Sequence, residues 1–184
     1  MDVRAAAIPE VKLILTRRHG DARGFFSETW NHRAFAAAGI LAEFVQDNHT
    51  HSAAAGTVRG LHFQIEPMAQ AKLIRCPKGA IFDVAVDVRR GSPTFGRHVA
   101  QVLSADDWNQ LFVPKGFAHG YCTLRPDTEV IYKVTNYYSP EHERGVLWND
   151  PALNIAWPVG PEEALVNERD RGFPPLSLAP ELFA

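Results

Sequence analysis

The sequence predicts an all-β fold, arranged as a sandwich or a barrel. Short runs rich in Val, Ile, Phe and Tyr recur along the chain, and turn segments with Gly or Pro, such as 77–79, 90–93 and 114–116, separate them. Many short strands at near-regular spacing favour a sandwich or barrel over alternating strands and helices. Patterns typical of helices are scarce, which agrees with that interpretation.

The expected strands begin near the N-terminus and continue to residue 135. The first, 11–16, alternates only weakly between apolar and polar side chains. The others have the β-branched and aromatic content typical of strands and lie at 58–64, 72–75, 81–88, 96–103, 110–113, 121–124 and 129–135.

Helices are expected only as short pieces at the periphery. Residues 31–38 combine Ala-rich helix propensity with Gly39 at their end. Ser104 and Asp107 have the spacing that caps a single helical turn. The tail after Gly160 contains four prolines, so we expect it to wrap the surface, with one short helix near 162–166.

Length and composition indicate one globular domain, residues 1–184. No linker rich in Pro, Gly or Ser divides the chain, and its length fits a single domain. Hydrophobic residues make up 46% of the chain and charged residues 22%, which excludes a disordered protein. The net charge of −2 lacks the basic excess of a nucleic-acid binder, so no nucleic-acid partner is expected.

The cysteines and the N-terminus indicate a cytoplasmic protein. Cys76 and Cys122 are too few for a disulfide scaffold and are expected as free thiols, with a single bridge between them as the less favoured alternative. The first residues contain an early acid and no long apolar stretch, unlike a signal peptide. No window approaches the ~18 apolar residues of a membrane span, so no membrane partner is expected.

The segment 81–88 raises a question that the sequence leaves open. A period of two places Asp83 and Asp87 on one strand face with Ile81 and Ala85, while the opposite face is wholly apolar. The face with the carboxylates either meets solvent or lines a polar cavity.

Histidines suggest a metal site as one alternative. His49 and His51 form a His-x-His pair, which small barrels use to hold a metal together with a carboxylate. No Glu follows within a few residues, so a hydrogen-bonded structural or catalytic role is favoured over metal ligation.

Four strand segments carry polar side chains between apolar neighbours. His62 is either a satisfied core histidine or a site residue, and Arg59 shares its face only if Gly60 forms a bulge or ends the strand. Lys72 is either an edge residue or a buried cation awaiting an anion. Tyr132 fits a strand and offers a phenol as an acid, and His119 lies between small residues where a ligand can approach.

The N-terminal segment Asp21-x-Arg23-Gly24-Phe25-Phe26-x-Glu28 concentrates charges and aromatic rings. Exposed Phe beside Arg indicates stacking or an interface. The alternative is a twisted edge strand with a turn at Gly24.

Taken together, these segments resemble the dTDP-4-dehydrorhamnose 3,5-epimerase family from about residue 10 to 175. No single motif is specific, but ten occur in the family's order. They are residues 21–28, Gln46-Asp-Asn-His49, Arg59-Gly-Leu-His-Phe-Gln64, Gln70-Ala-Lys-Leu73, Asp83-Val-Ala-Val-Asp87, Ser92-Pro-Thr-Phe-Gly96, Pro114-x-Gly-Phe-Ala-His-Gly120, Tyr132-Lys133, Tyr137-Tyr138 and Trp148-Asn-Asp-Pro151.

The resemblance implies a fold, a reaction and a partner. The fold is a cupin-like jelly-roll barrel with a few short peripheral helices. The reaction is epimerisation of dTDP-4-dehydro-6-deoxy-D-glucose at C3 and C5, without metal or other cofactor, in dTDP-L-rhamnose biosynthesis. The partner is a second copy in a homodimer that exchanges N-terminal segments.

The resemblance also implies four catalytic residues. His62 resembles the family's base, and Asp170 its acidic partner. Lys72 looks like the cation that stabilises an enolate, and Tyr132 looks like the acid on the opposite side of the sugar. Asn167 stands where the family usually has Ser, which weakens the alignment around Asp170.

Ten further residues resemble substrate-binding positions. Arg23 and Glu28 would reach the nucleotide from a partner subunit, Tyr138 would stack on thymine, and Arg59 and His119 would contact sugar and diphosphate. The full set is Arg23, Phe25, Glu28, Gln46, Asn48, Arg59, His119, Tyr138, Glu143 and Arg169. Arg169 replaces a frequent Lys, and Tyr121 a frequent Phe.

Three other functions remain open at this point. One is an epimerase acting only at C3 or C5 of a related nucleotide-linked 4-keto sugar. The others are a metal-binding cupin and a sugar-nucleotide binding module without catalysis.

Overall fold

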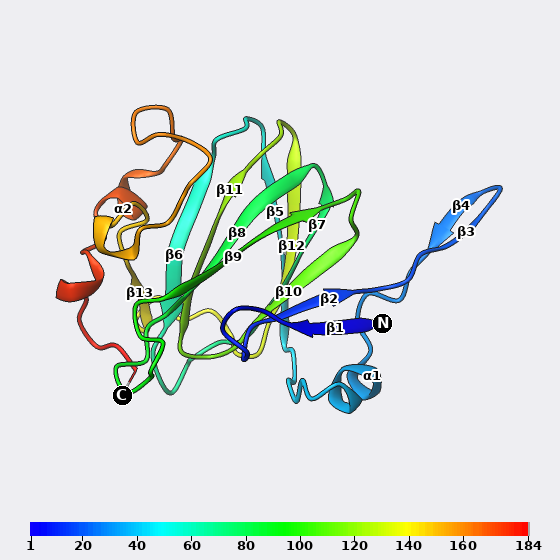
Figure 1. Ribbon diagram of the computed structural model, residues 1–184, viewed down its shortest axis with the longest axis horizontal. Helices are drawn as coiled ribbons and strands as arrows, with labels where there is room; N and C mark the ends of the chain where they lie inside the picture. The colour runs from blue at the N-terminus through cyan, green and yellow to red at the C-terminus, as the bar shows by residue number, and fades with distance from the viewer. Residues whose placement is uncertain (184) are drawn as a thin grey trace.

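Strands are the dominant regular element, and the computed structural model describes residues 1–183 (Figure 1). The strands of the body are β1 Asp2–Ala5, β2 Lys12–Leu15, β5 Gln46–Ser52, β6 Val58–Gln64, β7 Lys72–Lys78, β8 Ala80–Asp87, β9 His98–Ser104, β10 Asn109–Val113, β11 Phe117–Thr123, β12 Thr128–Val134 and β13 Glu143–Gly145. They form a six-stranded sheet in the order β1-β2-β10-β7-β12-β5 and a five-stranded sheet in the order β13-β6-β11-β8-β9.

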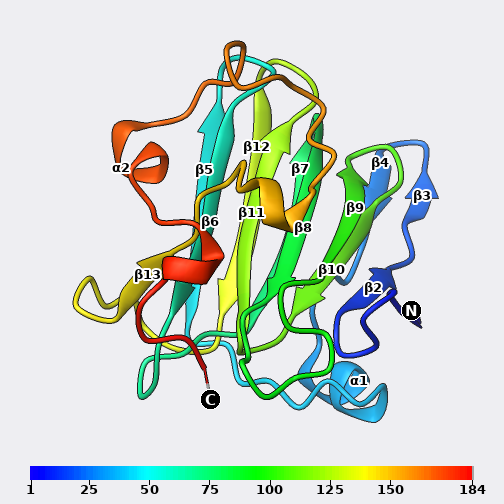
Figure 2. The same cartoon turned by 60° about the vertical axis from the view of Figure 1, so that its left-hand side comes forward.

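The two antiparallel sheets face one another, as Figures 1 and 2 show. Strands joined by short turns lie in opposite sheets, as β7 and β8 do, and so do β11 and β12. This arrangement confirms the predicted all-β jelly roll. Each predicted strand forms, with bounds shifted by up to a few residues. The sequence pattern missed β1 and β13, which are only four and three residues long, and β5, whose residues are all polar and carry no apolar alternation.

The helices are short and peripheral, as expected. They are α1 His32–Ala37, α2 Glu168–Arg171, and the 3₁₀ turns η1 Pro151–Leu153 and η2 Leu176–Leu178. Asn31 caps α1 by accepting a hydrogen bond from the Ala34 N–H at 3.1 Å. Gly39 follows with φ of +83°, a left-handed conformation that favours glycine.

One helix prediction was wrong, and one predicted capped turn is present. Residues 161–163 form a turn, and Leu165 pairs with Thr57 in an isolated parallel bridge, which requires extended backbone. Ser104 accepts the Asp107 N–H at 3.0 Å, and the Trp108 N–H donates to the Ser104 carbonyl at 3.0 Å. These bonds close the single capped turn that the spacing predicts, in the four residues between β9 and β10.

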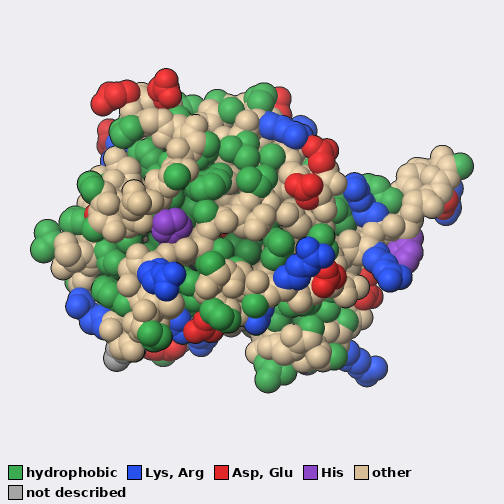
Figure 3. All heavy atoms as spheres, in the orientation of Figure 1, with side chains coloured by type: hydrophobic (Ala, Val, Ile, Leu, Met, Phe, Trp, Pro, Cys, Tyr) green, Lys and Arg blue, Asp and Glu red, His purple; other side chains and the backbone are tan. Residues whose placement is uncertain are grey.

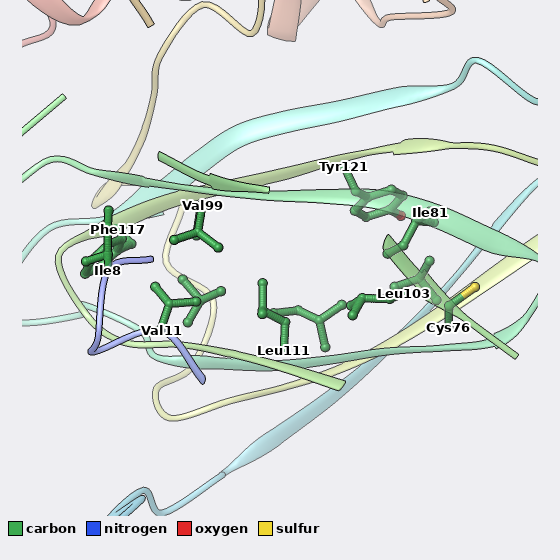
Figure 4. Packing of buried hydrophobic residues seen from close by; sticks show 13 residues of the cluster. Ile8, Val11, Cys76, Ile81, Val99, Leu103, Leu111, Phe117 and Tyr121 are labelled. Atoms are coloured by element: carbon green, nitrogen blue, oxygen red, sulfur yellow. The ribbon is translucent and has the colours of Figure 1, made fainter. Parts of the chain in front are cut away.

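The main core lies between the two sheets (Figure 4). It is built from the inward faces of β7 to β12, with Ile8 and Val11 closing one end. The outer face of the five-stranded sheet packs Val84, Val86 and neighbours against the C-terminal segment. Helix α1 covers part of the other sheet through Phe35. Hydrophobic side chains also gather on the surface at the upper centre of Figure 3.

Strand β8 shows where its carboxylates point. Asp83 and Asp87 are both 0% exposed and share the inward face with Ile81 and Ala85. The solvent-facing alternative was therefore wrong. Asp87 accepts hydrogen bonds from Arg89, Ser92 and the side chain of Thr94, while Asp83 meets His119. A buried carboxylate needs such partners, since leaving it unpaired is costly.

A two-stranded hairpin projects from the body on the side of the N-terminus (Figures 1 and 3). It consists of β3 His19–Asp21 and β4 Gly24–Phe26, and we call residues 19–26 the arm. Phe25 and Phe26 are exposed on it. Phe25 packs edge-on to Trp108 at a centroid distance of 4.9 Å, which ties the arm to the turn before β10.

Two further predictions concern thiols and membranes. Cys76 and Cys122 are buried free thiols, so the alternative of a bridge between them was wrong. Among residues 1–183, no helix is both long enough and apolar enough to cross a membrane.

Candidate active site

Two adjoining cavities lie between the sheets, and they share three side chains: His62, Lys72 and Tyr132. The inner cavity, of about 140 Å³, is also lined by Thr50, Arg59, His119, Tyr121, Asn167 and Asp170. The outer cavity, of about 240 Å³, is also lined by Gln46, Asn48, Phe63, Gln64, Gln70, Tyr138 and Glu143. Residues far apart in the sequence therefore converge on one continuous hollow.

A bulge in β6 brings Arg59 and His62 to the same cavity. His62 pairs with His119 of β11, and Arg59 pairs with Tyr121, so two residues of β6 oppose the single Gly120. The extra residue reverses the alternation of side chains, as the sequence analysis required. Gly60 has φ of +127°, and a Cβ there would lie 2.5 Å from the Cα of Gly120. Only glycine fits this close approach.

His62 forms a hydrogen-bonded pair with Asp170. His62 Nε2 lies 2.8 Å from Asp170 Oδ1, and the other carboxylate oxygen accepts the Gly60 N–H at 2.9 Å. Asn167 caps α2 by accepting the Asp170 N–H at 2.7 Å, so the Asn in place of Ser still holds this turn. The dyad partners are thus in contact, although His62 remains partly open to the cavity.

The pKa of Asp170 is lowered. Burial acts to raise it, but the hydrogen bond and charge of His62, the Gly60 N–H and the charge of Arg169 together outweigh burial. The carboxylate therefore stays ionised near neutral pH. Because an ionised carboxylate can only accept, Nε2 of a neutral His62 carries the proton and Nδ1 is the basic atom.

A second pair, His119 and Asp83, lies deeper. His119 Nε2 is 2.9 and 3.1 Å from the two oxygens of Asp83, and both side chains are buried. Burial lowers the pKa of His119 despite the nearby Asp83 carboxylate, and the charges of Lys72 and His62 lower it further. His119 is therefore neutral near pH 7 and fixed in orientation by Asp83.

Lys72 supplies a buried cation. It is 9% exposed, and its Nζ donates to the main-chain carbonyl of His62 at 3.3 Å. Burial lowers its pKa to about 8, while Glu143 and Asp83 act in the opposite direction. The ammonium is still mostly charged at neutral pH, and a buried charge acts strongly on a nearby anion because water screens it little.

Tyr132 faces His62 across the cavity. It lies on β12 of the six-stranded sheet, while His62 lies on β6 of the five-stranded sheet. Burial raises the pKa of Tyr132, and the charge of Arg59 partly offsets that effect. The phenol therefore stays protonated and can donate a proton.

The outer cavity is rimmed by a linked set of side chains. The Tyr138 hydroxyl donates to Glu143 Oε2 at 2.7 Å, and Arg169 forms an ion pair with the same oxygen at 2.5 Å. Gln46 accepts the Tyr138 N–H at 3.2 Å and donates to Asn48 Oδ1 at 2.9 Å. Five predicted binding residues therefore form one rim beside His62 and Tyr132.

Three predicted binding residues lie elsewhere. Arg23 and Phe25 are on the arm, where Arg23 forms an exposed ion pair with Asp21. Glu28 lines a separate cavity of about 140 Å³ at the base of the arm, together with Arg17 and His19. Within one chain these residues do not reach the shared cavities, so their predicted role depends on a partner subunit.

Sequence reasoning missed several residues of the site. Asp83 was noted for its strand face, but only the fold shows that it holds His119. Thr50 was not singled out, because it lies in the polar strand β5 that carried no strand signal. Gln64 and Gln70 belonged to recognised motifs without an assigned role, and both line the outer cavity.

Histidines of the His-x-His motif point away from the cavities. His49 pairs with Glu129 at 3.0 Å and His51 with Asp127 at 3.3 Å, both at the exposed surface. Within residues 1–183, no group of three or more His, Cys, Asp and Glu side chains is arranged to hold a metal ion.

Comparison with known proteins identifies the family of this chain. The model of the dTDP-4-dehydrorhamnose 3,5-epimerase family matches residues 5–177. The chain belongs to this family. A dTDP-4-dehydrorhamnose 3,5-epimerase from Sinorhizobium fredii is 51% identical over 183 residues, covering 100% of this chain and 93% of the relative.

Solved structures of this epimerase family share the fold. An enzyme from Bacillus anthracis, with TDP and PPi bound, has a TM-score of 0.91 and 50% identity, covering 95% of this chain and 98% of that one. One from Legionella pneumophila, in complex with dTDP-4-keto-L-rhamnose, has a TM-score of 0.92 and 41% identity, covering 96% and 93%. The cupin-like jelly roll and the membership in a family of isomerases, both predicted from the sequence, are thereby confirmed.

Proposed function

We propose that the protein converts dTDP-4-dehydro-6-deoxy-D-glucose to dTDP-4-dehydro-L-rhamnose by epimerising C3 and C5. This reaction belongs to dTDP-L-rhamnose biosynthesis. The observation that carries the proposal is the arrangement of His62, Lys72 and Tyr132 around one cavity, with the two titratable rings on opposite walls. The family and the bound nucleotides in its solved members support the substrate class.

The chemistry needs a base, a cation and an acid. The C4 ketone acidifies the C–H bonds at C3 and C5. Nδ1 of His62 takes one of these protons, and the electron pair of the C–H bond moves onto the C4 oxygen to give an enolate. Asp170 stabilises the imidazolium that forms, as the carboxylate of any His–Asp pair does.

Lys72 and Tyr132 complete each epimerisation. The Lys72 ammonium stabilises the enolate oxygen, which carries negative charge only after the proton has left. Tyr132 then donates its proton to the same carbon from the opposite face, and the C4 ketone reforms. The imidazolium of His62 then releases its proton to solvent, and the Tyr132 phenolate takes one from solvent, so the cycle consumes no cofactor.

The rim residues bind the rest of the substrate. Tyr138 stacks on thymine, with Gln46 and Asn48 beside it. Arg59 and His119 contact the sugar and diphosphate, since the fork of Arg donates two hydrogen bonds to a phosphate. Glu143 and Arg169 hold the rim in position through their ion pair.

A homodimer supplies the remaining contacts. The arm projects from its own chain, and its exposed Phe25 and Arg23 have no part in that chain's cavities. In a dimer with exchanged arms, Arg23, Phe25 and Glu28 reach the nucleotide of the partner's site. The free buried thiols are compatible with the cytoplasmic location that we also propose.

Solvent deuterium incorporation tests this function directly. The purified protein is incubated with dTDP-4-dehydro-6-deoxy-D-glucose in D₂O, and C3 and C5 are read by NMR. We expect deuterium at both carbons and formation of dTDP-L-rhamnose when a reductase is added. A stoichiometric metal measured in the same sample and required for activity would contradict the cofactor-free reaction.

Other outcomes define the alternatives. Deuterium at one carbon alone would identify an epimerase for C3 or C5 of a related sugar. Tight binding of dTDP without exchange at either carbon would identify a binding module. A solution mass of a monomer with full activity would remove the exchanged arm from the proposal.

A further inference from the structure

We propose that Tyr121 is a positioning residue whose hydrogen bond to Thr50 sets the separation between the wall that carries His62 and the wall that carries Tyr132. This inference rests on the proposed roles of His62 and Tyr132. Tyr121 does not touch the reacting carbons. It acts on the reaction through the geometry of the two walls.

Tyr121 is anchored in the five-stranded sheet. It lies on β11, two residues after His119 on the same inward face, and pairs with Arg59 and Asp83 of the neighbouring strands. Its ring packs in the main core beside Ile81 (Figure 4), and the residue is 4% exposed. The ring therefore belongs to the core while the residue also lines the inner cavity.

Thr50 is anchored in the opposite sheet. It lies on β5 and pairs with Val130 of β12, two residues before Tyr132 on the same face. Its Oγ1 lies 2.8 Å from the Tyr121 hydroxyl and 3.5 Å from the Val130 carbonyl. When Thr50 donates to Val130, Tyr121 donates to Thr50. A chain of hydrogen bonds then runs from the ring in one sheet to the main chain of β12 in the other.

Few other polar contacts join the two walls here. Lys72 reaches the His62 carbonyl at 3.3 Å, but its ammonium is the group that must respond to the enolate. Arg59 reaches His51 and Ser52, which lie just before the loop that joins β5 to β6. The Tyr121–Thr50 bond is shorter and joins two neutral groups. Burial raises the pKa of Tyr121 to about 12, so its proton stays in place.

The two proton transfers depend differently on this bond. His62, Asp170 and the Gly60 N–H contact one another beside β6, so abstraction depends on contacts within one wall. Delivery depends on Tyr132, which belongs to the other wall. A displacement of about 1 Å in a reacting group can cost about a hundredfold in rate. Loosening the walls should therefore impair delivery more than abstraction.

This difference is measurable as a ratio. When delivery fails, the imidazolium exchanges its proton with D₂O and returns deuterium to the same face of the carbon. Recovered substrate is then labelled without inversion. The measured ratio is the amount of deuterium-labelled recovered substrate divided by the amount of epimerised product. It reports how often Tyr132 fails to donate its proton after His62 has abstracted one.

The test uses Tyr121→Phe, which removes only the hydroxyl. We expect the ratio to rise about fivefold or more, with KM changed by less than about twofold, because the substrate contacts remain. Thr50→Val should give the same result, and the double variant should add little, since both remove one bond. Tyr137→Phe is the matched control, because its side chain is exposed and outside both cavities.

Three results would overturn the inference. An unchanged ratio in Tyr121→Phe and in Thr50→Val would show that the bond does not position the walls. A raised KM with an unchanged ratio would show that the hydroxyl contacts substrate instead. Additive effects in the double variant would show that the residues act separately. Melting temperatures identify a variant that has simply lost its fold, and Thr50→Val then carries the test.

Failure of the proposed function looks different. If wild-type protein exchanges no deuterium, or if His62→Ala still exchanges it, then the assignment of the base is wrong. Normal exchange in the wild type with no change in the variants removes only the role of Tyr121.

Discussion

Two histidine–carboxylate pairs face the same cavity from neighbouring strands, yet they differ in how far the histidine is exposed and in which element supplies the carboxylate. His62 and His119 lie directly opposite one another in the register of β6 and β11. The side chain of His62 is 28% exposed, and its partner Asp170 comes from helix α2, far along the sequence. The side chain of His119 is 7% exposed, and its partner Asp83 lies on the adjacent strand β8.

The difference shows how one residue type serves two purposes. A base must exchange protons with solvent between turnovers, so it cannot be sealed off. A histidine whose pKa is lowered by burial stays neutral and can hold a substrate group by a directed hydrogen bond. The structure thus favours His62 for proton transfer and His119 for binding.

Removal of the two rings should give the largest contrast. We expect His62→Ala to lower kcat by about 10³-fold or more, because the variant lacks the proposed base. We expect His119→Asn to raise KM by about tenfold with a smaller effect on kcat, since a buried hydrogen bond to substrate is lost. Steady-state kinetics, with circular dichroism as a check of folding, measures both. Equal loss of kcat in the two variants would end the distinction.

Substitution of the two carboxylates tests the same contrast indirectly, because each carboxylate acts through its histidine. Asp170→Asn should lower kcat by about 10²-fold, because a neutral amide cannot stabilise the imidazolium and can favour the wrong tautomer. Asp83→Asn should act mainly on KM by releasing His119. A kcat for Asp170→Asn within about threefold of wild type would remove the carboxylate from the proton transfer.

The pH profile should report Lys72. Its pKa of about 8 means that the ammonium loses its proton as pH rises through that value, so kcat should fall above it by about tenfold per pH unit. In Lys72→Arg the guanidinium stays charged, and the alkaline limb should disappear even if the rate is lower. An unchanged limb in that variant would assign it to another group.

Asp87 provides a control on the same strand face. Its carboxylate accepts bonds from Arg89, Ser92 and Thr94; these outweigh the effect of burial and lower its pKa to about 2. The folded pKa lies below the unfolded value, so the stabilisation is present above about pH 4 and is lost as pH falls towards 2. Asp87→Asn should cost about 2 kcal/mol at neutral pH, with kcat and KM little changed. Denaturant unfolding at several pH values measures this, and a large loss of activity in the folded variant would place Asp87 in the site.

Much of the fold could be predicted because its strands alternate or are strongly β-branched. The longest strand that carried no such signal, β5, is polar on both faces, since its inner face lines the site and its outer face meets solvent. The helix expected at 162–166 failed because Leu165 is held extended by Thr57, a contact that no local pattern shows. In both segments, contacts with residues far away in the sequence determine the backbone conformation.

The site also combines residues that motifs identify with contacts that only the fold determines. His62, Lys72 and Tyr132 could be named from motifs, and each lies in the shared cavities. The pairing of His119 with Asp83 depends on the register of β11 against β8, which the sequence does not state. The arm residues cannot be placed from one chain at all, because their predicted target lies on another.

The bulge at Gly60 leaves a pattern in the sequence that can be recognised in other proteins. In a regular strand, two side chains that face one cavity are an even number of residues apart, yet Arg59 and His62 are three apart and line the same hollow. The odd interval, with a glycine inside it, records the bulge in the sequence itself. It also divides β6 into two halves whose side-chain directions are independent. Polar residues at odd spacing across a glycine therefore indicate a strand that can combine two tasks, one on each side of the bulge.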